Sequence, residues 1–302
     1  MHLLPSKNTH QYFRGNLHGH SNHSDGVLDP QEVVNKYKEI GYDFTCLSDH
    51  LWKGSKFAAK TVLETKNLNQ GDFITIPSAE LHCKGKKYIR DGLWHIVANG
   101  LPLDFQCADE EETAPHLVQR AIEAGAFVTI AHPEWYSLTF DECLSLSHAH
   151  GIEIYNHSCH IEAQRGFGTA AADYLLQENN RIFLTATDDS HFKMQDSGGG
   201  WVMVAADELS ESSILNALKN GQYYSSTGVE IFEFEINNYQ VNIQCSPSNQ
   251  VCVVGQGAKS MSQNGKNITQ AEFDLKKYPS DWFRVSIAND SGDFAWTNPV
   301  WL

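Results

Sequence analysis

Two histidines in the segment Asn16–Gly26 have a spacing that suits a metal site. His18 and His20 are separated by one residue, and in a β-strand the side chains of residues i and i+2 point the same way. We therefore expect both imidazoles to project together from the carboxyl end of the first strand, where barrel enzymes keep their chemistry. Two imidazoles aimed in this way form half a site for zinc, iron or manganese. The pair alone is weak support, because a single histidine is commonly a hydrogen-bonded loop residue.

Further carboxylates and imidazoles accompany later apolar runs of the chain. They are Asp49 and His50 after Phe44–Leu47, Glu80 after Phe73–Pro77, His95 in His95–Ala98, His132 after Phe127–Ile130, and Asp189 and His191 after Ile182–Ala186. We expect each of them at the same end of its strand, so that the fold gathers them on one rim. Any one of them could be a loop histidine or a helix-capping carboxylate. Their recurrence at six strand ends favours a multinuclear metal centre.

The elements that must position these residues alternate short apolar runs with helical segments, which is the pattern of βαβ units. The runs expected to form strands are Tyr12–Leu17, Phe44–Leu47, Phe73–Pro77, His95–Ala98, Phe127–Ile130, Glu153–Tyr155 and Ile182–Ala186. Between them, Asp29 and Pro30 predict a helix start, and Thr139 with Glu142 predicts a capping box. Short connections and right-handed crossovers turn such an array into a parallel barrel or a doubly wound sheet.

After Gly228 the pattern changes to alternating apolar and polar residues between turn-rich segments. The runs that indicate strands are Val229–Val241, Val251–Val254 and Trp282–Ile287. We therefore expect an α/β unit, either a parallel barrel or a doubly wound sheet, in residues 1–228 and a small, sandwich-like antiparallel β module in residues 229–302. Three tryptophans of this module could supply an apolar contact, to the barrel or in an oligomer: Trp282, Trp296 and Trp301.

The composition restricts the class of protein and of partner. The chain has 22 Lys plus Arg and 37 Asp plus Glu, for a net charge of −15. Such a surface repels a polyanion, which argues against nucleic acid as the main partner, whereas a small anionic substrate can bind where metal cations supply positive charge. The chain shows no apolar run of membrane-helix or signal-peptide length, so we expect no membrane partner and a cytoplasmic location. The seven cysteines contain no CxxC pair and are expected to be reduced and mostly buried.

Taken together, the motifs resemble those of the PHP (polymerase and histidinol phosphatase) superfamily, and the resemblance covers the whole chain. The matching residues are His18 and His20 followed by Ser24-Asp25-Gly26, then Asp49-His50, Glu80, His95, His132, and Asp189 with His191. Other stretches resemble one branch of this superfamily, made up mostly of metal-dependent phosphoesterases and including carbamate-hydrolysing relatives. These stretches are Glu153–Asn156, Ala186–His191, Gly200–Val202, Tyr223–Gly228 and Ala295–Pro299.

The resemblance implies a fold and a set of metal ligands. The fold would be α/β, a distorted (β/α)7 barrel that holds two or three divalent metal ions. The ligands would be His18, His20, Glu80 and Asp189 for the first ion, the bridging Glu80 with His95 and His132 for the second, and Asp25, His50 and His191 for the third. Asp49 is expected to orient His50 or a neighbouring ligand, with direct binding to a metal ion as the alternative. Because imidazole donors dominate, Zn, Mn or Fe is expected rather than Mg or Ca.

The expected reaction is hydrolysis of a small phosphate ester, a monoester or a diester, by a metal-activated hydroxide. His157, after the sixth strand, could bind the substrate or donate a proton, and Arg165 and Lys193 could hold a phosphate group. Each of these three could equally be a structural or solvated side chain. Two alternatives keep the same fold: a hydrolase of a carboxylic ester, carbamate or amide at the same metal site, and a non-catalytic module.

Six further histidines are expected to be structural or at the surface, with His23 as the first candidate for an exception. They are His23, His82, His116, His148, His150 and His160.

Overall fold

A computed structural model describes residues 2–4, 10–86 and 92–302 of the chain. All seven apolar runs expected to form strands do so. They become β2 (Tyr12–Asn16), β3 (Phe44–Leu47), β5 (Ile74–Lys84), β6 (Leu93–Asn99), β7 (Phe127–Ile130), β8 (Gly151–Asn156) and β9 (Phe183–Thr187). Two further strands, β10 (Trp201–Ala205) and β11 (Tyr223–Ser226), extend the sheet beyond β2, and the short β4 (His50–Leu51) pairs with β5.

The strands curve into an open sheet, so the expected parallel barrel is not confirmed. β2, β3 and β5 pair in parallel, as do β7, β8 and β9, but β6 runs antiparallel to both of its neighbours. Among the described residues no backbone ladder joins β9 to β11. Instead Ser225 spans the gap, because its Oγ accepts from the N–H of Ala186 at 2.9 Å and donates to the carbonyl of Leu184 at 2.8 Å.

Helices lie between these strands. They are α1 (Pro30–Glu39), α2 (Ala114–Glu123), α3 (Phe140–Ser145), α4 (His157–Ala163), α5 (Thr169–Gln177) and α6 (Glu211–Lys219), with a 3-10 turn at Lys66–Leu68. The two predicted helix starts are confirmed at α1 and α3. Complete capping boxes start α1, with Asp29 and Glu32, and α3, with Thr139 and Glu142. These caps satisfy N–H groups that a helix start leaves without partners. No described helix is long and apolar enough to cross a membrane.

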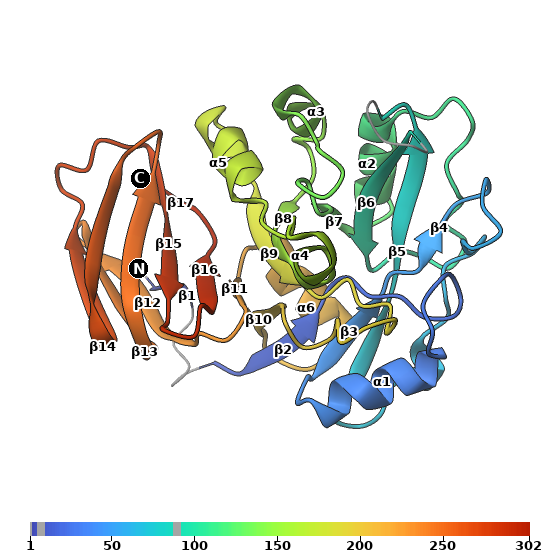
Figure 1. The fold of residues 1–302 in the computed structure, drawn as a ribbon, viewed down its shortest axis with the longest axis horizontal. Helices are drawn as coiled ribbons and strands as arrows, with labels where there is room; N and C mark the ends of the chain where they lie inside the picture. Colours follow the sequence, from blue (N-terminus) through green and yellow to red (C-terminus); the bar gives the residue numbers. More distant parts are fainter. Residues whose placement is uncertain (1, 5–9, 87–91) are drawn as a thin grey trace.

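The strands after Gly228 form an antiparallel array at one end of the molecule, where both chain termini also lie (Figure 1). They are β12 (Ile231–Asn237), β13 (Gln240–Gly255), β14 (Ser260–Asp274), β15 (Trp282–Ala288), β16 (Phe294–Thr297) and β17 (Val300–Trp301), joined by the N-terminal β1 (His2–Leu4) beside β12. A ladder between β11 and β16 makes the sheet continuous with the rest of the fold. The domain boundary after residue 228 remains a prediction.

Apolar and ionic contacts hold this array against α5. Trp282 and Trp296 are buried in the same core cluster as Leu175 of α5, and burial of such side chains contributes roughly 1.5–3 kcal/mol each. Arg284 in β15 is also buried, and its guanidinium donates to both carboxylate oxygens of Asp173 at 2.8 and 2.9 Å. The apolar contact suggested by the tryptophans is therefore made within the chain.

Candidate metal centre

Ten histidine and acidic side chains meet at one edge of the curved sheet, close enough to share metal ions. Within each of five overlapping groups, the candidate ligand atoms lie within 4.8 Å of one another. The set contains all nine residues expected as ligands: His18, His20, Asp25, His50, Glu80, His95, His132, Asp189 and His191. The tenth is His82, which we expected to be structural or at the surface.

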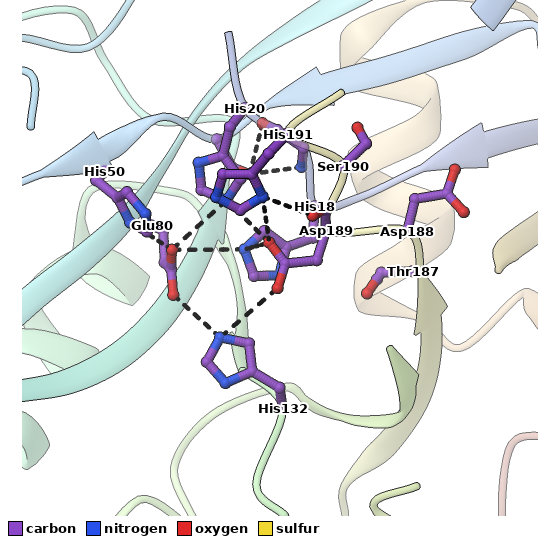
Figure 2. Close-up of polar contacts among 12 residues, drawn as sticks. His18, His20, His50, Glu80, His132, Thr187, Asp188, Asp189, Ser190 and His191 are labelled. Atoms are coloured by element: carbon purple, nitrogen blue, oxygen red, sulfur yellow. Dashed lines mark hydrogen bonds and ion pairs between the residues drawn. The ribbon is translucent and has the colours of Figure 1, made fainter. Parts of the chain in front are cut away.

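Glu80 lies at the middle of the cluster and faces a different group of imidazoles with each carboxylate oxygen (Figure 2). Its Oε1 is 2.6 Å from Nδ1 of His95 and 3.2 Å from Nε2 of His132. Its Oε2 is 2.6 Å from Nδ1 of His50 and 3.6 Å from Nε2 of His18. A carboxylate with ligand groups on both sides has the arrangement needed to bridge two cations.

Two strands reach this edge in a way that the sequence pattern did not predict. Glu80 lies inside β5, which continues to Lys84, and not after the end of a strand. His95 lies near the beginning of β6 and not at its end. Because β6 is antiparallel to β5, its beginning pairs with the end of β5, and His95 stands opposite His82. The reversal of β6 is the reason why His95 reaches the common edge.

Asp189 provides a second carboxylate between the histidines. Its Oδ1 is 3.0 Å from Nε2 of His20 and 3.2 Å from Nε2 of His18, and its Oδ2 accepts from Nδ2 of Asn156 at 3.1 Å. The backbone φ of Asp189 is +54° and that of His132 is +22°. Residues other than glycine rarely adopt positive φ values. Backbone strain of this kind persists at functional sites, where the surroundings hold the conformation in place.

Asp25 forms the third corner of the centre. Its Oδ1 is 3.4 Å from Nε2 of His50 and 3.3 Å from Nε2 of His191, and its Oδ2 accepts from the ammonium of Lys193 at 2.8 Å. These three candidate ligands come from distant parts of the sequence, and His20 lies in the same group.

Asp49 holds the loop that carries two of the candidate ligands. Its carboxylate accepts hydrogen bonds from the backbone N–H and hydroxyl groups of both Ser21 and Ser24, at 2.6–3.1 Å. This loop connects His20 to Asp25. The expectation that Asp49 orients a neighbouring ligand therefore takes a specific form, because it fixes the loop between these two residues.

In two of the histidines, a hydrogen bond at Nδ1 leaves the other ring nitrogen, Nε2, free to bind a cation. Nδ1 of His18 lies 2.8 Å from Oε1 of Glu153, and Nδ1 of His191 lies 2.9 Å from the carbonyl of Asp189. An acceptor at Nδ1 places the ring hydrogen there and leaves a lone pair on Nε2. Nε2 of His18 is buried and has no hydrogen-bond partner among the described residues. The residues present therefore fit divalent metal ions.

Glu153 contacts the cluster directly, although no role was predicted for it from the sequence. It is buried in β8 between Ile152 and Ile154, where an ionisable side chain needs partners. Its two oxygens accept from His18, from Thr187 and Asn156, and from the backbone of His132. A glutamate within an apolar strand was the signal that could have revealed it.

The electrostatics of the cluster keep its carboxylates ionised. Burial would raise the pKa of Glu80, but the neighbouring imidazoles of His50 and His95 outweigh it and hold this pKa well below its usual range. Burial lowers the pKa of His20 to about 3, and the neighbouring His191 and His50 add to this shift. The imidazole of His20 is therefore neutral at neutral pH and can donate a lone pair to a cation. The ionised carboxylate oxygens and the neutral imidazole of His20 form an environment that attracts cations.

A cavity of about 250 Å³ opens onto the cluster. Its walls include Lys193, Ser158 and Glu162 beside the candidate ligands. A second cavity of similar volume shares part of the cluster and is apolar on its other walls, with Trp52 and Phe57.

Of the three residues expected to serve the substrate, only Lys193 lines the cavity at the cluster. His157 begins α4 and lines a different cavity, and its Nδ1 lies 3.1 Å from the hydroxyl of Tyr155. Arg165 follows α4 and is exposed. The catalytic roles of His157 and Arg165 remain predictions, and this placement gives them no support.

Comparison with known proteins places the fold. No family model and no curated protein sequence matches the chain. Among solved structures, the chain is similar to a two-domain protein from Bacteroides vulgatus ATCC 8482, which is described as containing a predicted PHP-like metal-dependent phosphoesterase. The two sequences are 18% identical, and the TM-score is 0.53. The match covers 98% of this chain and 97% of that one. An amidohydrolase from Chromobacterium violaceum covers 59% of this chain and 87% of its own, with 14% identity and a TM-score of 0.41. The full-length likeness shows that the chain has the fold of the PHP-like two-domain protein, in agreement with the resemblance of its motifs.

Proposed function

We propose that this protein is a metal-dependent hydrolase that cleaves a small phosphate ester, either a monoester or a diester. The observation that carries the proposal is the position of Glu80, whose two oxygens face separate groups of imidazoles at 2.6–3.6 Å. Neighbouring cations bridged by a carboxylate are the typical arrangement for phosphoryl chemistry. The description of the Bacteroides vulgatus protein as a phosphoesterase supports the choice of substrate.

The ligand groups divide among two or three ions. We assign His18, His20 and Asp189 to the first ion, His95 and His132 to the second, and Asp25, His50 and His191 to the third, with Glu80 between the first two. When bound, Zn, Mn or Fe ions would lower the pKa of a water molecule and offset the charge of the phosphate group.

The side chains around the cluster would bind and orient the substrate. The ammonium of Lys193 stands at the cavity beside Asp25, where it can attract a phosphate oxygen as a point charge. Such local attraction is needed because the protein as a whole carries −15. The apolar walls at Trp52 and Phe57 would contact the organic part of the substrate.

Three chromogenic esters test the proposal and separate it from its alternatives. The metal-reconstituted protein should hydrolyse p-nitrophenyl phosphate or bis-p-nitrophenyl phosphate, and Glu80→Gln should abolish this activity. Glu162→Gln is the matched control, because it changes a carboxylate of the same cavity that is not among the candidate ligands. Activity on p-nitrophenyl acetate alone would replace phosphate esters with carboxylic esters and related substrates. Absence of turnover on all three by a metal-loaded protein would contradict the proposal.

A further inference from the structure

The apolar cavity beside the metal centre is continuous with the cavity at the cluster. Four residues line both cavities: Asp25, His50, His95 and Trp135. Three of the four are candidate metal ligands. A molecule bound at the metal centre through one group can therefore extend its other group into the apolar cavity, so that the two cavities act as two parts of one binding site.

The walls of the apolar cavity away from the cluster are mainly aromatic. They include the rings of Trp52, Phe57 and Trp135 beside small or aliphatic side chains. Apart from the two indoles, Ser55 carries the only polar side chain on these walls among the described residues. A sugar or a second phosphate group needs several hydrogen-bond partners when it is buried, and these walls do not supply them. The cavity therefore suits an apolar ring.

Hydrogen bonds fix the loop that carries two of these aromatic walls. The N–H of Ala59 donates to the carbonyl of His50 at 2.7 Å, and the N–H of Trp52 donates to the carbonyl of Ala59 at 3.2 Å. The ammonium of Lys60 donates to the carbonyls of Trp52 and Ser55, both at 2.5 Å. The loop starts at a candidate metal ligand and is ordered before a substrate binds, which lowers the entropic cost of binding.

Phe57 and Trp135 are placed to contact a ligand. Phe57 is 62% exposed, and its ring centroid lies 4.8 Å from the ammonium of Lys56. A ligand that covers this ring removes apolar surface from water, which favours binding. The ring of Trp135 lies 5.6 Å from that of His95 and 5.1 Å from that of His132, at angles of 68° and 74°. Trp135 is thus held against the metal centre while it lines both cavities.

The volume of the apolar cavity fits one ring system. It measures about 250 Å³, and a cavity of about 150 Å³ is enough to bind benzene. An aromatic ring should bind more tightly here than an alkyl ring of the same size, because pairs of aromatic rings attract one another beyond the effect of the buried area.

We propose that the substrate is a phosphate ester whose organic part is a single aromatic ring system, bound among Trp52, Phe57 and Trp135. The phosphate group lies at the metal centre, where Lys193 lines the first cavity but not the second. This inference rests on the proposed function for the phosphate group and adds the class of the organic part. Phe57 is then a residue that determines specificity.

Three phosphonates, which have no ester bond to hydrolyse, test the ring site separately from catalysis. The full-length, metal-reconstituted protein should bind phenylphosphonate at least about 10-fold more tightly than methylphosphonate, because the ring is buried. It should also bind phenylphosphonate more tightly than cyclohexylphosphonate. Phe57→Ala should weaken phenylphosphonate at least about threefold more than methylphosphonate. Phe140→Ala is the matched control and should leave both affinities unchanged, because Phe140 is 49% exposed and lines neither cavity.

Affinities measured by isothermal titration calorimetry decide the proposal. Equal binding of the phenyl and methyl compounds would overturn it, and so would cyclohexylphosphonate that binds as tightly as phenylphosphonate. A phenyl-to-methyl ratio that is the same in Phe57→Ala and the wild type would also overturn it.

A phosphate-free probe separates this inference from the proposed function. If no phosphonate binds, the proposed function loses its phosphate group, and 4-nitrophenol then tests the ring site alone. Binding of 4-nitrophenol should quench the tryptophan fluorescence of the wild type more than that of Phe57→Ala, since Trp52 and Trp135 line the cavity. Equal quenching in the two proteins, or none, would overturn the inference.

Discussion

Replacement of Glu153 by glutamine should weaken the first metal site and the fold together. Each of its carboxylate oxygens accepts two hydrogen bonds: Oε1 from His18 Nδ1 and the Thr187 hydroxyl, both at 2.8 Å, and Oε2 from the His132 N–H at 2.7 Å and the Asn156 amide at 2.8 Å. A glutamine keeps one acceptor oxygen and turns an NH₂ group toward the other pair of donors. Two buried donors then lack an acceptor.

The size of the effect follows from that count. Leaving a buried donor unsatisfied costs about 1–3 kcal/mol, so two of them lower the free energy of unfolding by about 2–6 kcal/mol. If the NH₂ group faces His18, its ring hydrogen must move to Nε2, and the lone pair needed by the first metal ion is lost. We therefore expect Glu153→Gln to lower zinc affinity about 10–100-fold.

Urea unfolding of the metal-free protein and chelator competition for zinc measure these two effects separately. Glu162→Gln serves as the control, because Glu162 lines the cavity but is exposed. If Glu153→Gln matched the wild type in both its free energy of unfolding and its zinc affinity, the hydrogen bonds of Glu153 would support neither the fold nor the first metal site.

Other substitutions test separate parts of the account. Lys193→Ala should raise KM about fivefold for a phosphate ester with little change in kcat, corresponding to roughly 1 kcal/mol for a half-exposed charge; an unchanged KM in steady-state assays would remove Lys193 from the binding site. Arg284→Met should lower the free energy of unfolding by about 2–3 kcal/mol, less than for a fully buried pair because 25% of the Asp173 side chain is exposed; urea titrations that match the wild type would show that the pair contributes nothing. In metal-free protein, burial lowers the pKa of His191, but Asp25 and Asp189 outweigh it and raise this pKa to about 9. Since the folded value lies above the ordinary 6.5, the stability that the wild type gains over His191→Gln should be complete below pH 6.5 and disappear as the pH rises through about 9; a gain that grows with pH would contradict this.

Eight of the nine candidate ligands could be predicted because each follows or lies in a readable strand, whereas Asp25 was predicted only from the resemblance of its motif. Strand alternation placed His18 and His20 on one side, and apolar runs located Asp189 and His132. The same alternation could have identified His82, which is two residues from Glu80. Because His82 belongs to no recognised motif, it was expected to be structural or at the surface. The catalytic roles of His157 and Arg165 were predicted only from their positions after the sixth strand. Where these two side chains lie depends on the direction of α4, which the sequence pattern does not give.

The parts of the fold that escaped prediction depend on long-range pairing. The antiparallel direction of β6 is set by its neighbours β5 and β7, and an apolar run does not show its direction. β14 was missed because it is largely polar and exposed, and it pairs only with β13 in the described part of the chain. Between β9 and β11, side-chain hydrogen bonds of Ser225 stand where a backbone ladder would close the sheet, and no local sequence pattern reveals this.

The number of metal ions bound per chain shows whether the cluster around Glu80 is a metal centre. After saturation with zinc, manganese or iron and removal of free metal, mass spectrometry should find two or three ions in the wild type and in Glu162→Gln. Glu80→Gln should bind at least one ion fewer, because three of the overlapping groups of candidate ligands share this carboxylate. A wild type with one ion or none, or a Glu80→Gln protein with the full number, would contradict a centre built around Glu80.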